Sequence, residues 1–213
     1  MARGPTTLSW SGVDGDQSAR EVLQVIARAG EGGRLPEWLH AAGGGGHRRA
    51  GQTATAIQPL EEGTHHILDT SSEGSQGAQA TFEVTGGGGD VEPPDAPATV
   101  TASEYTFKTS GLKAGSNRVR FENAGQEPHH IIMAPIKRGK KIDDVRAFAR
   151  TDKGEPPVEE EKFMGTAVLD GGASQVVDLE LEKGKYAALC FITDRKGGPP
   201  HAVKGMVTEV DVQ

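Results

Sequence analysis

Residues 186–212 have the sequence YAALCFITDRKGGPPHAVKGMVTEVDV and include Cys190, the single cysteine of the chain. An apolar run typical of a strand enters this stretch, and an alternating polar and apolar run, Val207–Val212, leaves it. His201 and Met206 lie between the two runs. The pattern predicts two strands joined by a loop with three side chains that can bind a soft metal ion.

A thiolate, an imidazole and a thioether on one loop, in this order, are the ligands of a mononuclear blue-copper site. Such a site needs one more histidine from elsewhere in the chain. Taken alone, Cys190 is more typical of a buried core residue, and His201 of an ordinary loop histidine. The order of the residues and the His-x4-Met spacing together favour a metal site.

The composition favours short strands and turns over helical packing. The chain has 213 residues, 30 of them glycine, and its hydrophobic content is 35%. A net charge of −7 and scattered basic residues argue against nucleic-acid binding, and the basic run 137–141 is most simply a solvated loop. A single cysteine excludes an internal disulfide, and no apolar run is long enough to span a membrane.

Alternation and turn residues predict an all-β chain with one short helix in each half. We expect helices at 35–39 and 141–150, and the β-branched run 21–27 fits a strand better than a helix. The other predicted strands are 6–10, 52–60, 64–70, 78–85, 99–108, 117–122, 130–136, 175–181, 185–192 and 207–212.

Residues 86–97, GGGGDVEPPDAP, have the composition of a linker that is flexible at its start and stiffer at its end. We therefore expect a first domain at 1–86, a linker at 87–97 and a second domain at 98–213. Each is long enough for one β-sandwich.

The two halves align as a degenerate repeat. The segment 64–69 matches 185–190 and 82–84 matches 210–212, while Arg20 matches His130 and Trp38 matches Phe148. This alignment places Asp69 opposite Cys190, and the first copy offers no set of metal ligands. The metal site is therefore expected in the second half alone.

The predicted strand 99–108 has no counterpart in the first half. A sheet edge left unpaired is prone to association. We expect the natural chain to extend further at its N-terminus, or another segment or a second copy of the chain to cover that edge.

Three segments of the second half resemble the cupredoxin family. FENAG at 121–125 followed by Pro128-His129, GKYAALC at 184–190, and HAVKGM at 201–206 are similar to that family's copper-binding segments. The resemblance implies two tandem Greek-key β-sandwiches, of which the first is a degenerate and N-terminally incomplete copy. It also implies one copper, bound by His129, Cys190, His201 and an axial Met206.

Two features leave alternatives open. His130 is a substitute ligand for His129, because neighbours on a strand point to opposite faces and only one can face the site. The Pro-His register favours His129. Ten residues separate Cys190 from His201, which is more than in small blue-copper proteins, so this loop must order itself to bring the two ligands together. We expect a turn at 197–200, GGPP, that brings His201 back toward Cys190.

The ligand set and the resemblance predict a type 1 copper electron-transfer protein rather than an enzyme, because no His-x-His pair is present to feed further coppers. The alternatives are a cupredoxin-like binding or structural module without copper, and a copper storage or delivery protein. A redox protein is the expected partner, and a periplasmic or extracellular location follows from the resemblance. The remaining histidines and the run 159–161 are expected to be structural or solvated.

Overall fold

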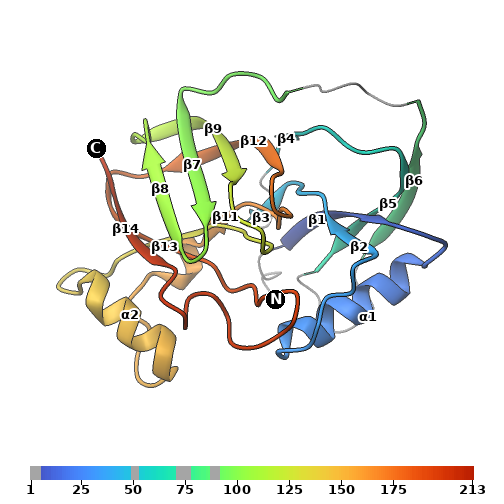
Figure 1. The fold of residues 1–213 in the computed structure, drawn as a ribbon. Helices are drawn as coiled ribbons and strands as arrows, with labels where there is room; N and C mark the ends of the chain where they lie inside the picture. Colours follow the sequence, from blue (N-terminus) through green and yellow to red (C-terminus); the bar gives the residue numbers. More distant parts are fainter. Residues whose placement is uncertain (1–5, 49–52, 71–77, 87–91) are drawn as a thin grey trace.

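The computed structural model describes residues 6–48, 53–70, 78–86 and 92–213. The chain is all-β, with two units along the sequence that each include one short α-helix (Figure 1). This is the fold class that the sequence predicts.

The elements follow one another along the chain as a series of short strands. In order they are β1 (Thr6–Val13), α1 (Ala19–Gly30), β2 (Leu39–Ala41), β3 (Gly46–Arg48), β4 (Ala56–Ile57), β5 (Gly63–Asp69), β6 (Gln79–Val84), β7 (Ala98–Ser103), β8 (Thr106–Ser110), β9 (Gly115–Asn123), β10 (Ile132–Pro135), α2 (Ile142–Thr151), the 3-10 turn η1 (Glu160–Lys162), β11 (Met164–Gly165), β12 (Ser174–Leu181), β13 (Gly184–Leu189) and β14 (Val207–Val212).

The second unit is a sandwich of two sheets. One sheet has the order β11-β10-β13-β14 and the other has the order β4-β12-β9-β7-β8. Alternation explains their packing: along β9, Asn117, Val119, Phe121 and Asn123 are buried and the residues between them are more exposed. The apolar residues of the two inner faces, Phe121 and Tyr186 among them, form the main core. Cys190 is part of this core.

The first unit is built around a sheet of order β2-β1-β5-β6, with β3 also paired to β1. The apolar face of α1 packs against this sheet through Val22 and Leu23, which contact Val13 and Leu68. In the second unit, α2 packs through Val145 against the outer face of the β10–β13–β14 sheet in the same way. Each unit thus has one helix on the outside of one sheet.

Helix α1 covers the run 21–27, for which a strand is the preferred prediction. Ser18 and Glu21 form a capping box: the Ser18 hydroxyl accepts from Glu21 N, and the Glu21 carboxylate accepts from Ser18 N. This start signal, followed by buried residues at helical spacing, outweighs the β-branched content. The strand prediction is therefore wrong and the helical alternative is correct.

Other segments also differ from the prediction. Residues 35–39 form no helix, because long-range hydrogen bonds hold them: Trp38 O accepts from Asp14 N, and Leu35 N donates to Arg195 O. Residues 99–108 contain parts of two strands, β7 and β8, which pair as a hairpin. Of 52–60, the structure assigns strand to Ala56–Ile57, and residue 52 lies outside the described residues.

The alignment of the two halves agrees with the structure in the C-terminal part of each unit and differs from it in the N-terminal part. Gly63 pairs with Val84 in the β5–β6 hairpin and Gly184 pairs with Val212 in the β13–β14 hairpin, which is the register that the alignment of the C-terminal parts gives. In the N-terminal parts, α1 follows β1 as α2 follows β10. Arg20 lies in α1 whereas His130 precedes β10, so these two residues are not equivalent.

The two units contact each other extensively. Strand β4 belongs to the first unit by sequence but pairs with β12 of the second. Gly43 N donates to Val168 O, and Gly44 N donates to the side chain of Gln175. The described residues therefore form one interlocked body, while residues 87–91 of the expected linker lie outside the description.

Candidate metal centre

Three side chains from separate segments converge in the second unit. Cys190 directly follows β13, His129 precedes β10, and His201 lies in the turn before β14. The Cys190 Sγ lies 3.7 Å from His129 Nδ1 and 3.5 Å from His201 Nδ1, and the two Nδ1 atoms are 3.0 Å apart. All three residues are fully buried. Each therefore offers one ligand atom to a common point.

These distances fit a first-row metal ion. An ion about 2.0–2.1 Å from nitrogen and about 2.3 Å from sulfur places neighbouring ligand atoms roughly 3.4–3.8 Å apart. The two sulfur–nitrogen distances agree with this range, and the nitrogen–nitrogen distance is somewhat shorter. One thiolate and two imidazoles in a trigonal arrangement are the donor set of a blue-copper site. The residues present therefore fit copper.

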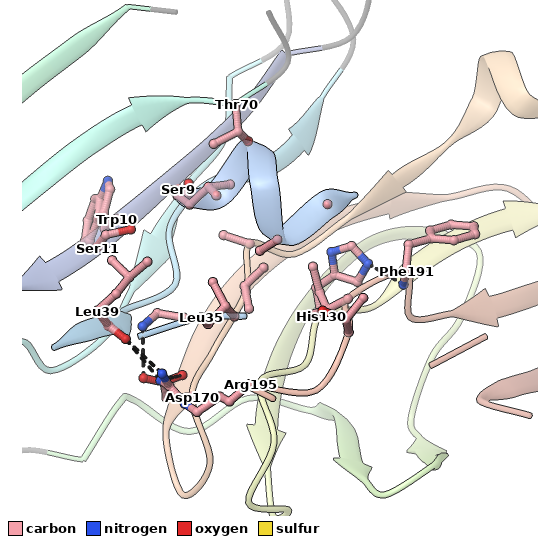
Figure 2. A pocket seen from close by; sticks show the side chains of 18 of the residues that line it. Ser9, Trp10, Ser11, Leu35, Leu39, Thr70, His130, Asp170, Phe191 and Arg195 are labelled. Carbon is pink, nitrogen blue, oxygen red and sulfur yellow. Dashed lines mark hydrogen bonds and ion pairs between the residues drawn. The ribbon is translucent and has the colours of Figure 1, made fainter. Parts of the chain in front are cut away.

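His129 and His130 point in different directions. His129 Nδ1 faces Cys190, whereas His130 Nε2 accepts a hydrogen bond from Phe191 N at 3.0 Å. His130 and Phe191 line a cavity of about 290 Å³ between the two units, and Figure 2 shows both side chains at its wall. The geometry thus brings His129, and not His130, to the cluster.

Met206 is fully buried and follows His201 closely. Its backbone N–H donates to His201 O at 2.9 Å, which closes the turn that carries both residues. His201 N in turn donates to Ile192 O, and Ala202 N donates to Cys190 O. The loop therefore folds back on the end of β13, and hydrogen bonds close the segment that contains Cys190, His201 and Met206.

The outer nitrogen of His201 contacts Asp194. His201 Nε2 lies 3.0 Å from Asp194 Oδ1, and the same carboxylate accepts hydrogen bonds from Tyr105 OH and Lys204 Nζ. The Tyr105 and His201 rings lie 5.0 Å apart, and the Lys204 ammonium lies over the Tyr105 ring. Since Nε2 donates its proton to Asp194, Nδ1 keeps a free lone pair for a metal.

The outer nitrogen of His129 also faces a carboxylate. Glu104 Oε1 lies 3.6 Å from His129 Nε2 and accepts hydrogen bonds from Gln126 N and Glu127 N. The Asn123 side chain stabilises the turn before His129 through hydrogen bonds with Gly125 N, Glu127 O and Leu169 O. Both histidines therefore present Nδ1 to Cys190 and have a carboxylate near Nε2.

Burial keeps the cluster neutral without an ion. Burial raises the pKa of Cys190 to about 12. Burial, together with repulsion from His129, lowers the pKa of His201 to about 4 and outweighs the opposing effect of Asp194. Burial likewise lowers the pKa of His129, against attraction from Glu104. At neutral pH the cluster thus has one thiol and two neutral imidazoles.

Asp194 itself is held as a carboxylate. Burial opposes its ionisation, but hydrogen bonds from Lys204, Tyr105 and His201 outweigh that effect and lower the pKa of Asp194. Sequence reasoning missed Asp194, Tyr105, Lys204 and Glu104. Asp194 and Lys204 lie near the ligands in sequence, but their common partner Tyr105 is far away and no motif marks it.

The histidines expected to be structural have other partners. His66 hydrogen-bonds Thr81 and a backbone carbonyl, and His65 bonds a backbone carbonyl and stacks on Phe82. His40 pairs with Asp14 on the surface. Among the described residues, the cluster of His129, Cys190 and His201 is the one group of three or more such ligands within binding distance of each other.

No helix among the described residues is both long enough and apolar enough to cross a membrane.

Comparisons with known proteins give weak matches. No protein-family model and no curated protein matches the chain. Among solved structures, the chain is similar to an auracyanin from the photosynthetic bacterium Roseiflexus castenholzii (19% identity, covering 54% of this chain and 94% of that one, TM-score 0.35). It is also similar to auracyanin B (21%, 59% and 96%, TM-score 0.37) and to a multicopper oxidase (15%, 99% and 71%, TM-score 0.29). Matches with identities and TM-scores this low do not assign a function to the chain.

Proposed function

We propose that this protein binds one copper ion in its second unit and transfers single electrons. The observation that carries the proposal is the convergence of Cys190 Sγ and the Nδ1 atoms of His129 and His201 at a fully buried point. Met206 is proposed as the weak axial ligand, as in the copper proteins that the sequence resembles. Bound copper would supply a one-electron redox couple.

The residues of this chain would keep that couple reversible. A hydrogen bond to Asp194 holds His201, backbone hydrogen bonds with Leu169 hold His129, and Cys190 directly follows β13, so the ligand set would change little between redox states. Full burial excludes water from the ligands. It also favours permanent retention of the ion over delivery to a partner, because no ligand is open to attack from solvent.

We further propose that the protein is not an enzyme, that its partner is a redox protein, and that it works in the periplasm or outside the cell. Oxidases of this kind need additional coppers, and the sequence has no His-x-His pair to bind them. The location and the partner rest on the sequence resemblance to cupredoxins.

Copper titration of the purified protein tests the proposal. Added Cu(II) is expected to bind one ion per chain and to produce an intense visible band from thiolate-to-copper charge transfer. Cys190→Ser should abolish the band, while His130→Gln, which alters the neighbouring histidine only, should retain it. A wild-type protein that stays colourless and binds no copper would leave a β-sandwich module without a metal.

A further inference from the structure

The ten residues between Cys190 and His201 are anchored on the first unit. The Arg195 guanidinium donates to Leu39 O, at the start of β2, at 3.1 Å and to Pro36 O, just before β2, at 3.2 Å. It also pairs with Asp170 at 2.6 Å, and Figure 2 shows Arg195, Asp170 and Leu39 together beside the cavity. Arg195 is mostly buried there. One loop side chain thus bonds two backbone carbonyls of the other unit.

The loop backbone makes further contacts with the first unit. Leu35 N donates to Arg195 O at 2.9 Å, and Gly198 N donates to Gly32 O at 3.3 Å. A Cβ atom at Gly197 would lie 2.6 Å from Gly32 O, so the two backbones touch where the side chain is absent. The loop therefore lies against the segment after α1 along several residues.

The segment that positions His129 is anchored in the same way. Leu169 forms a backbone bridge to His129 on one side and to Ala42 of the first unit on the other. The neighbouring Asp170 accepts a hydrogen bond from Ala41 N and donates one to Ala41 O. Both histidine-bearing segments thus rest on the stretch that includes β2.

From these contacts we propose that the metal-free first unit clamps the ligand loop, with Arg195 as the positioning residue. This inference rests on the proposed copper site. Asp194 precedes Arg195 and orients the His201 ring. The hydrogen bonds of Arg195 to the first unit therefore also hold Asp194 in place beside His201. The first unit lacks ligands of its own, yet it completes the geometry of the site in the second unit.

The physical reason is the length of the loop. Closing a loop costs more entropy as it lengthens, and each flexible residue must also be ordered before His201 can meet Cys190. Contacts with the first unit provide that ordering before any ion binds. Without these contacts, ion binding would have to order the loop. The free energy of binding would then be less favourable by the cost of that ordering.

Substitutions of Arg195 test the clamp in the protein with and without metal. In metal-free protein, Arg195→Ala is expected to speed amide hydrogen exchange across 191–198, with little change in the distant β7–β8 hairpin. In the copper form it should weaken binding about 10- to 100-fold and alter the visible and EPR spectra of the ion. Arg195→Lys should restore part of the loss, because an ammonium keeps the positive charge but lacks the planar fork with which the guanidinium bonds both carbonyls. Arg118→Ala, which breaks the exposed pair with Asp178, is the control.

Two adjacent glycines, Gly197 and Gly198, allow a matched test of the backbone contact between the loop and the first unit. Both have positive φ angles, +82° at Gly197 and +119° at Gly198, so an alanine strains either position. A Cβ at Gly197 meets Gly32 O and Gly33 O, whereas a Cβ at Gly198 meets no atom within 4 Å. Gly197→Ala is therefore expected to loosen the loop and weaken copper binding more than Gly198→Ala.

The outcomes separate this inference from the proposed function. If wild-type protein binds no copper, the proposed function fails, and the exchange experiment on metal-free protein still tests the clamp. If wild-type protein binds copper and Arg195→Ala matches it in affinity, spectrum and loop exchange while remaining folded by circular dichroism, the clamp is overturned. Equal effects of the two glycine substitutions would also count against it.

Discussion

Cys190 is the residue whose chemistry changes most when an ion binds. It is fully buried, and burial raises the pKa of its thiol to about 12, so the metal-free protein holds a protonated thiol at neutral pH. Copper binds the thiolate, so the proton must leave. His201, with a pKa of about 4, and His129, with a lowered pKa, are already deprotonated at pH 7.

Proton release follows from these values. Binding of Cu(II) at pH 7 is expected to release about one proton per ion, all of it from Cys190, and apparent affinity should rise about tenfold per pH unit up to the pKa of the thiol. Titration in two buffers of different ionisation enthalpy measures the number directly. Release of two or more protons would show that the histidines are charged in the metal-free state, against the effect of their burial.

Asn123, at the end of β9, links a strand to the metal centre. Its side-chain amide donates to Glu127 O and Leu169 O and accepts from Gly125 N, so it holds the turn that leads to His129. Asn117, near the start of the same strand, makes a similar set of three backbone bonds far from the cluster. Both asparagines are buried.

Because both asparagines lie on β9, their substitutions provide a controlled test of whether the Asn123 turn positions His129. Asn123→Ala and Asn117→Ala are each expected to lower the free energy of unfolding by about 1–3 kcal/mol, because buried backbone groups lose their partners. Only Asn123→Ala should also weaken copper binding, by about 10- to 100-fold. Chemical denaturation and copper titration of both variants measure this. Equal copper affinity in the two variants would mean that the Asn123 turn does not position His129.

Elements with local signals were predictable, and elements fixed by distant contacts were not. β9 follows from strict alternation, β12 and β14 follow from partial alternation, and the three residues that the structure brings together follow from their motifs. The β-branched residues of the run 21–27 favour a strand, but the capping box of Ser18 and Glu21 starts a helix there. The segment 35–39 could not be predicted, since its conformation depends on Arg195 in the other unit.

The surroundings of the site were also beyond prediction from one sequence. Tyr105 and Glu104 lie between β7 and β8, far in sequence from the ligands that they support. Their roles depend on the way the two sheets pack. The sequence predicts that the long loop between Cys190 and His201 orders itself through a turn at 197–200, whereas the structure also shows hydrogen bonds from this loop to the first unit.

The two units are joined too closely to unfold one at a time. β4 pairs with β12, the loop after β2 bonds Gln175, and Arg195 joins both units beside the metal centre. Separate unfolding of the first unit would expose these groups without partners. A cooperative transition of the whole molecule is therefore expected.

Calorimetry tests that expectation. The metal-free protein should unfold in one transition, with a calorimetric enthalpy close to the van't Hoff enthalpy. Copper at 1,000 times its dissociation constant should stabilise the whole molecule by about 4.1 kcal/mol and move the single transition upward. Two separate transitions, of which copper moves only one, would show independent units and would also weaken the case for a clamp.

The position of the ion is the most direct test of the account. Anomalous diffraction at the copper edge, from crystals of copper-loaded protein, is predicted to show one copper per chain bonded to His129 Nδ1, Cys190 Sγ and His201 Nδ1, with Met206 as a more distant axial ligand. A copper bound at His130 or at the surface histidines, with no peak between His129, Cys190 and His201, would contradict it.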